Sequence, residues 1–109
     1  MEDMNADAGQ FISLEQAKEF VDHYKNLPGS GPIRAHGFGK NKLLEIINQP
    51  NAVGARFYYG YEQLPNGTFK QNLVVIGVNS ANEDIMDTNK ILEFSNTCPP
   101  HCPPDQKGL

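Results

Sequence analysis

Residues 53–62 read VGARFYYGYE and residues 69–78 read FKQNLVVIGV, and these two stretches decide the fold. Both are rich in aromatic and β-branched side chains, which is typical of β-strands. Asn66 and Gly67 lie between them and favour a tight turn, because both residue types tolerate a positive φ. The sequence therefore predicts an antiparallel β-hairpin.

The turn sets the predicted register of this hairpin. A two-residue loop at Asn66-Gly67 gives the pairs Tyr59 with Val74, Phe57 with Ile76, and Ala55 with Val78. One face would then be wholly apolar and suited to packing against helices. The opposite face would be an interaction face of four residues: Arg56, Tyr58, Leu73 and Val75. A mainly apolar outer face needs a cover, either from the segment around residues 91–94 or from a second copy of the chain.

Two helices are predicted before the hairpin. Ser13 and Gln16 form a capping box, and apolar residues then recur at helical spacing, so residues 14–26 are expected to be helical. A second helix is expected over residues 40–48, ending before Pro50. Residues 33–39 between them are expected to be an irregular connection. The predicted class is α+β, with the two N-terminal helices packed on the antiparallel hairpin and a short third segment after it.

Length and charge limit the domain organisation and the partners. The chain has 109 residues, and we expect a disordered N-terminus over 1–10, a single α+β domain over 11–96, and a flexible Pro/Cys-rich tail over 97–109. A net charge of −4 with scattered basic residues argues against nucleic acid as a partner. No apolar run is long enough for a membrane span, and no secretory signal is visible. The expected location is cytoplasmic, where thiols are usually reduced.

The tail holds the one local cluster of reactive side chains, in the sequence CPPHC. Cys98, His101 and Cys102 are ligand types that zinc and copper(I) prefer, and the two thiols also allow a redox role. An extended proline run would keep the sulfurs too far apart for one metal or one disulfide, whereas a turn at Pro99-Pro100 would bring them together. A tail that is inert or binds a protein partner is the favoured alternative, and no other cofactor is expected.

No catalytic set is visible elsewhere. The three histidines lie in different predicted elements, and no serine lies in a nucleophile elbow. The polar stretch at residues 79–84 carries oxygen ligands of the kind calcium prefers, but a polar turn is favoured because the spacing of a calcium loop is missing. We therefore do not expect an enzyme.

The chain also resembles a group of small bacterial proteins. The shared pieces are a "QP…VG.R.YYG" strand, a "VGVN…ED" strand end and a "CPP.C" tail. Here they are Gln49-Pro50, Val53-Gly54, Arg56, Tyr58-Tyr59-Gly60, Gly77-Val78-Asn79, Glu83-Asp84, Cys98-Pro99-Pro100 and Cys102. The resemblance implies the same architecture and a bacterial origin, and no activity is established for the group.

These observations predict a non-catalytic interaction module. We expect it to form a homo-oligomer through the hairpin and to present its tail to a protein partner. The alternative is a metal-binding or thiol-redox protein that works through the CPPHC motif.

Overall fold

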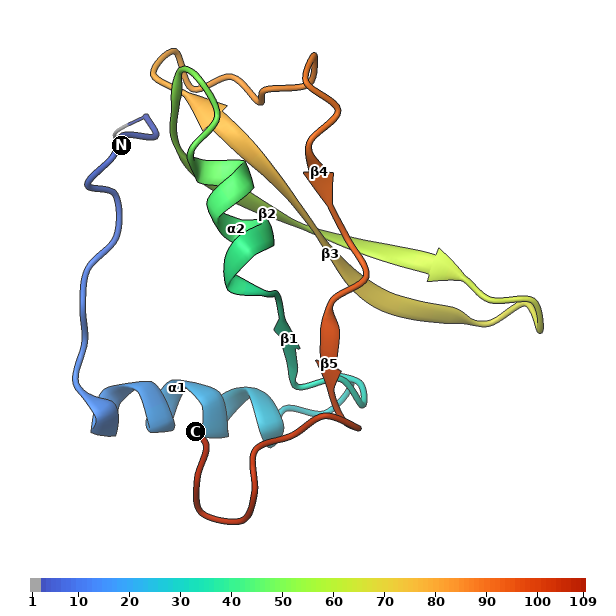
Figure 1. Ribbon diagram of the computed structural model, residues 1–109. Helices are drawn as coiled ribbons and strands as arrows, with labels where there is room; N and C mark the ends of the chain where they lie inside the picture. The colour runs from blue at the N-terminus through green and yellow to red at the C-terminus, as the bar shows by residue number, and fades with distance from the viewer. Residues whose placement is uncertain (1–2) are drawn as a thin grey trace. The chain divides into compact units, whose positions relative to one another are not determined.

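The computed structural model describes residues 3–109, and these residues form an α+β structure in which all paired strands are antiparallel (Figure 1). The helices are α1 (Leu14–Lys25) and α2 (Lys40–Ile47). The strands are β1 (Ala35–Gly37), β2 (Ala52–Gln63), β3 (Phe69–Asn79), β4 (Ile91–Leu92) and β5 (Asn96–Cys98). The α+β class, both helices and both hairpin strands are confirmed.

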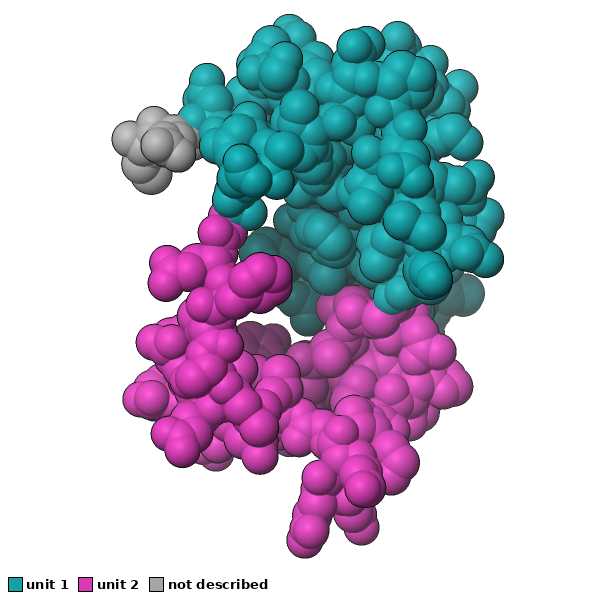
Figure 2. Space-filling model, turned by 60° about the vertical axis from the view of Figure 1, so that its left-hand side comes forward, with its two compact units in different colours: residues 1–8, 38–95 teal, residues 9–37, 96–109 magenta. Residues whose placement is uncertain are grey.

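The described residues fall into two compact units (Figure 2). Unit 1 contains residues 3–8 and 38–95, and unit 2 contains residues 9–37 and 96–109. The single domain expected over 11–96 stays a prediction. Strands β1 and β5 are far apart in the sequence but pair with each other. Together with α1 they belong to unit 2.

Unit 1 is built on a three-stranded sheet in the order β2-β3-β4. Helix α2 packs on this sheet and contacts all three strands. Gly77 permits the close approach, because a Cβ atom at this position would lie 2.9 Å from Gln49 Nε2 and 3.3 Å from the carbonyl oxygen of Ile46. One helix, α2, therefore contacts the hairpin, whereas the sequence predicts that both N-terminal helices pack on it. Helix α1 belongs to unit 2 and has no buried residue, so the packing predicted for it is not confirmed.

The apolar core of unit 1 is small. Its buried hydrophobic residues are Ile46, Val75, Ile76, Val78 and Ile85. Ile85 is held over the sheet by its main-chain N–H, which donates to the carbonyl of Gly77 at 2.8 Å. Burial of five aliphatic side chains contributes only a modest hydrophobic free energy, of roughly 2 kcal/mol for each side chain.

The predicted hairpin register is wrong by one residue. Tyr59 pairs with Leu73 and Phe57 with Val75, because the loop has three residues rather than two. The Gly67 N–H donates to the Leu64 carbonyl at 2.9 Å, and Gly67 has a φ of 88°. This is a type I turn with Pro65 at its second position, followed by a glycine in the left-handed region.

The corrected register also changes the predicted faces. Paired residues share a face of the sheet, so Leu73 and Val75 lie on the α2 side with Phe57 and Tyr59. Arg56 and Tyr58 lie on the other side, opposite Ile76 and Val74. The four residues predicted as one interaction face are therefore divided between the two faces. Val75 has no exposed surface and belongs to the core.

A polar turn joins β3 to the rest of unit 1. The Asn79 side-chain oxygen accepts from the main-chain N–H groups of Ala81 and Glu83, each at 3.0 Å. Val78 then forms an antiparallel bridge with Asp84. Further along the chain, the short third segment forms β4, which pairs with β3. Stretch 79–84 is therefore the predicted polar turn.

Unit 2 contains α1 and the short β1–β5 sheet. Ser13 caps α1 as predicted, accepting from the Gln16 N–H at 3.1 Å. The expected irregular connection contains β1, and the expected flexible tail begins inside β5, where Thr97 is buried. Thr97 and Cys98 belong to β5, and the flexibility expected for residues 97–109 stays a prediction.

The disordered N-terminus expected over residues 1–10 stays a prediction. Met1 and Glu2 lie outside the described residues. In the following segment the Met4 N–H donates to the side-chain oxygen of Asn82 at 3.1 Å. This hydrogen bond ties residues 3–8 to unit 1.

Candidate functional site

Strand β2 is an edge of the unit 1 sheet, since among residues 3–109 β3 is its only hydrogen-bonded neighbour in the sheet. Figure 1 shows the distal part of the hairpin extending past α2. The exposed aromatic side chains on the α2 side of the hairpin, with their exposed fractions, are Phe57 (48%), Tyr59 (85%), Tyr61 (74%) and Phe69 (63%). Tyr61 and Phe69 make an edge-to-face contact with their ring centroids 6.4 Å apart. An open edge that carries exposed aromatics is a surface suited to pairing with another strand.

The hydrogen bonds of the turn show which N–H and C=O groups of β2 do not bond to β3. The Leu64 N–H donates to the Thr68 carbonyl at 2.7 Å, so these two residues form a hydrogen-bonded pair. Hydrogen-bonded and non-hydrogen-bonded pairs alternate along an antiparallel ladder. The even-numbered residues of β2 therefore bond to β3. The odd-numbered residues between Ala55 and Gln63 direct their N–H and C=O groups away from the sheet.

A polar cluster lies on the opposite face of β2. The Arg56 guanidinium donates to Asp84 Oδ1 at 2.6 Å and to the side-chain oxygen of Asn82 at 2.8 Å. The Tyr58 hydroxyl donates to the second carboxylate oxygen of Asp84. The side chains of Arg56 and Asp84 are 33% and 18% exposed. Because β2 is joined to the turn after β3 by these bonds, the cluster holds the strand in place.

The cluster also favours the charged form of Arg56. Hydrogen bonding with Tyr58 and the charge of Asp84 raise the pKa of the guanidinium, and desolvation by burial opposes this increase. Like other arginines, Arg56 is a cation, and it lies on the open edge strand.

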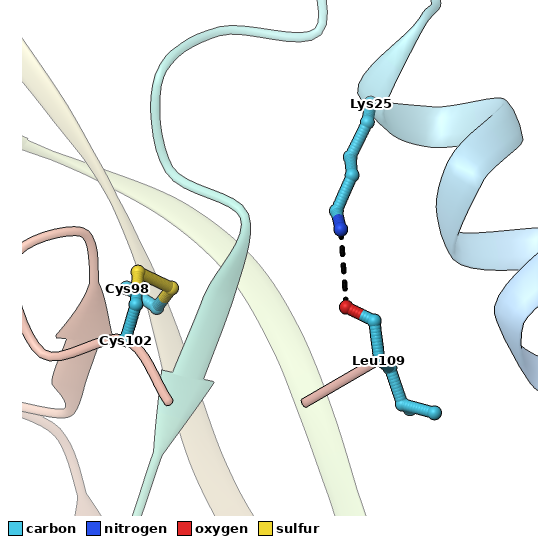
Figure 3. The surroundings of a disulfide bond; sticks show 4 residues. All are labelled: Lys25, Cys98, Cys102 and Leu109. Carbon is cyan, nitrogen blue, oxygen red and sulfur yellow. Dashed lines mark hydrogen bonds between the residues drawn. A yellow bond between two sulfur atoms is a disulfide. The ribbon is translucent and has the colours of Figure 1, made fainter. Parts of the chain in front are cut away.

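Unit 2 contains the second candidate site, a disulfide between Cys98 and Cys102 (Figure 3). The Cys98 carbonyl accepts from the Arg34 N–H at 2.7 Å, and the His101 N–H donates to the Thr97 carbonyl at 2.9 Å. These bonds turn the chain back on itself at Pro99-Pro100, so the sulfurs meet despite the prolines. The sequence left this turn open as an alternative to an extended run.

A pocket of about 700 Å³ lies beside the disulfide within unit 2. Its lining includes both cysteines and three basic side chains, those of Lys18, Lys25 and Arg34. The Lys25 ammonium donates to the main-chain oxygen of Leu109 at 3.0 Å, as Figure 3 shows. The sequence did not predict this pocket, because α1 and the tail are far apart in the chain and no local pattern indicates that they line a common cavity.

Two features of residues 3–109 concern metal binding and membrane insertion. No three His, Cys, Asp or Glu side chains of these residues are grouped so that they could hold a metal ion. In the disulfide form, Cys98 and Cys102 are not thiolate ligands. Within the same range, neither helix has the length and apolar character needed to cross a membrane.

The comparisons with known proteins place the chain in no family. No protein-family model matches it, and no curated protein or solved structure shows significant similarity to it.

Proposed function

We propose that the protein is a non-catalytic interaction module that self-associates through its hairpin. The observation that carries this proposal is the twelve-residue edge strand β2, with its open main-chain groups and exposed aromatic side chains. Its sequence contains no proline and only two charged residues, Arg56 and Glu62, and its one irregularity lies at the start, between Ala52 and Gly54, so the rest of the strand is a weakly protected edge. Pairing with another strand would satisfy the open main-chain groups and bury the aromatic rings.

Sedimentation equilibrium of the full chain tests self-association. We expect a dimer that weakens at least about tenfold in Kd when Tyr59 is replaced by lysine, because a central aromatic of the edge would be lost. The matched control is Met86→Lys, which introduces the same charge at another exposed apolar residue of unit 1. A wild-type chain that stays monomeric at high micromolar concentration, or equal effects of the two variants, would contradict the proposal.

The disulfide supports a second candidate, a thiol–disulfide exchange protein. Cys102 is exposed, and its bonded partner Cys98 lies only four residues before it in the sequence. An incoming thiolate would attack the Cys102 sulfur, forming a mixed disulfide and releasing the Cys98 thiolate. A second thiol of the reactant would then release Cys102, so that the reactant is oxidised by two electrons and the protein is left with two reduced cysteines. Zinc or copper binding by Cys98, His101 and Cys102 remains a prediction for that reduced form.

Incubation of the native protein with reduced glutathione tests exchange. An exchange protein would be reduced while folded, and its Cys98→Ser variant would retain a mixed disulfide on Cys102. If the native disulfide persists until the protein is unfolded, its role is structural. The oligomeric state measured in the same samples separates this result from the self-association proposal.

A further inference from the structure

We propose that the partner is a second copy of the chain, aligned antiparallel along β2 about a two-fold axis at Tyr59. The two sheets would then form one continuous sheet of six strands, three from each copy. This inference rests on the proposed self-association and adds its geometry.

The charges of β2 favour this alignment. In the whole strand, Arg56 and Glu62 are the only charged residues. With the axis at Tyr59, residues whose numbers sum to 118 face each other, so Arg56 of each copy lies opposite Glu62 of the other. Opposite charges directly across a strand pair are stabilising. A guanidinium has five N–H donors, so Arg56 can bind Glu62 in addition to its bonds with Asp84 and Asn82.

The open main-chain groups fit the same alignment. The odd-numbered residues of β2 direct these groups outward, so a new strand must bond to odd-numbered residues. Tyr59 then forms a hydrogen-bonded pair with its own copy, and Phe57 lies opposite Tyr61 of the other copy. These aromatic pairs would cover rings that the single chain leaves exposed. On the other face, Tyr58 lies opposite Gly60, which leaves room for the ring.

Neighbouring two-fold alignments lose the charge match. If the axis moves by one residue towards the N-terminus, Arg56 faces Gly60 and Glu62 faces Gly54. If it moves by one residue towards the turn, Arg56 faces Leu64 and Glu62 faces Tyr58. Of these three axes, only the one at Tyr59 places Arg56 opposite Glu62 and also places Phe57 opposite Tyr61.

Site-directed cross-linking tests the alignment in the full chain. Under mild oxidation, Tyr59→Cys should form a disulfide with its own copy, because directly paired Cα atoms are about 5.5 Å apart. A mixture of Phe57→Cys and Tyr61→Cys chains should cross-link with each other. Tyr61→Cys alone is the control: in this alignment its two copies are offset by four residues, or roughly 13 Å along the strand. Mass mapping of the linked peptides distinguishes these bonds from Cys98–Cys102.

We expect the Tyr59→Cys chain and the mixed chains to cross-link at least about tenfold faster than Tyr61→Cys alone. Efficient cross-linking of Tyr61→Cys to itself, or a dimer in which neither expected bond forms, would overturn the alignment but leave self-association standing. A monomeric wild-type chain would refute the proposed function itself.

Charge reversal gives a test that does not depend on introduced cysteines. Glu62→Lys places lysine opposite Arg56 in both halves of the pair, so Kd should rise about tenfold. Asp87→Lys makes the same change of charge at an exposed residue outside the strands and should leave Kd within about twofold. Equal effects of the two variants would contradict the charge pairing.

Discussion

The two halves of the β2–β3 hairpin have opposite surroundings although they belong to the same strands. In the proximal half, which lies against α2, Val75 and Ile76 are buried, and Gly77 lets α2 approach closely. In the distal half, which ends at the turn between β2 and β3, Tyr59 and Tyr61 expose most of their surface. The proximal half is explained by the stability of one chain, whereas the distal half has apolar surface that folding alone does not use.

Residues of the proximal half stabilise unit 1, whereas exposed residues of the distal half are available to a partner. Both halves are rich in large apolar side chains, so composition does not distinguish them. What distinguishes them is the reach of α2, whose eight residues are too few to cover both long strands. The substitutions below test this division, from the largest expected effect to the smallest.

Introducing an aspartate into each half should have very different effects on folding. Val75→Asp places a carboxylate in the core and should prevent folding at room temperature, because no buried partner compensates for its lost hydration. Tyr59→Asp should change the free energy of unfolding by no more than about 0.5 kcal/mol. Urea denaturation at low protein concentration measures both without a contribution from association.

A folded Val75→Asp variant would show that the proximal half is not the core. A Tyr59→Asp variant that unfolds would show that the distal half stabilises the single chain.

The packing of α2 on the proximal half can be weakened by one methyl group. Gly77→Ala brings a Cβ atom against Gln49 and the main chain of α2, so it should lower the free energy of unfolding by about 1–3 kcal/mol. Thermal and urea denaturation measure the loss. An unchanged stability would mean that α2 can move away freely, contrary to the close contact described above.

The polar cluster between the halves should have a smaller effect. Asp84→Asn removes the charge that binds Arg56 and weakens the bond accepted from Tyr58, so Tm should fall by a few degrees. Asp87→Asn, at an exposed position outside the strands, is the control and should leave Tm unchanged. Equal Tm values for the two variants would mean that the cluster does not hold β2 in place.

Sequence patterns predicted the elements better than their arrangement. Helical spacing and the Ser13 cap located α1, and β-branched and aromatic composition located β2 and β3. The predicted register is wrong because Asn66-Gly67 by itself indicates a two-residue loop. A proline at the second turn position favours the three-residue loop that is present here.

The remaining errors concern contacts between distant segments. Strands β1 and β5 have three residues each, which is too short for alternation to be recognised. The Cys98–Cys102 bond depends on the turn that β5 makes after pairing with β1, and local composition suggested an extended run instead. For the site, the sequence predicts Arg56, Tyr58, Leu73 and Val75 on one face. Because the register is shifted, Leu73 and Val75 lie on the opposite face from Arg56 and Tyr58.

Amide hydrogen exchange at increasing protein concentration tests most directly whether the open edge of β2 pairs with another chain. We expect the outward N–H groups of Phe57, Tyr59 and Tyr61 to exchange quickly in dilute solution and to become protected as the concentration rises. The N–H groups of Tyr58 and Glu62, which β3 already bonds, should change much less. Exchange at the outward amides that stays fast at every concentration would contradict the account, because the edge strand would then remain unpaired.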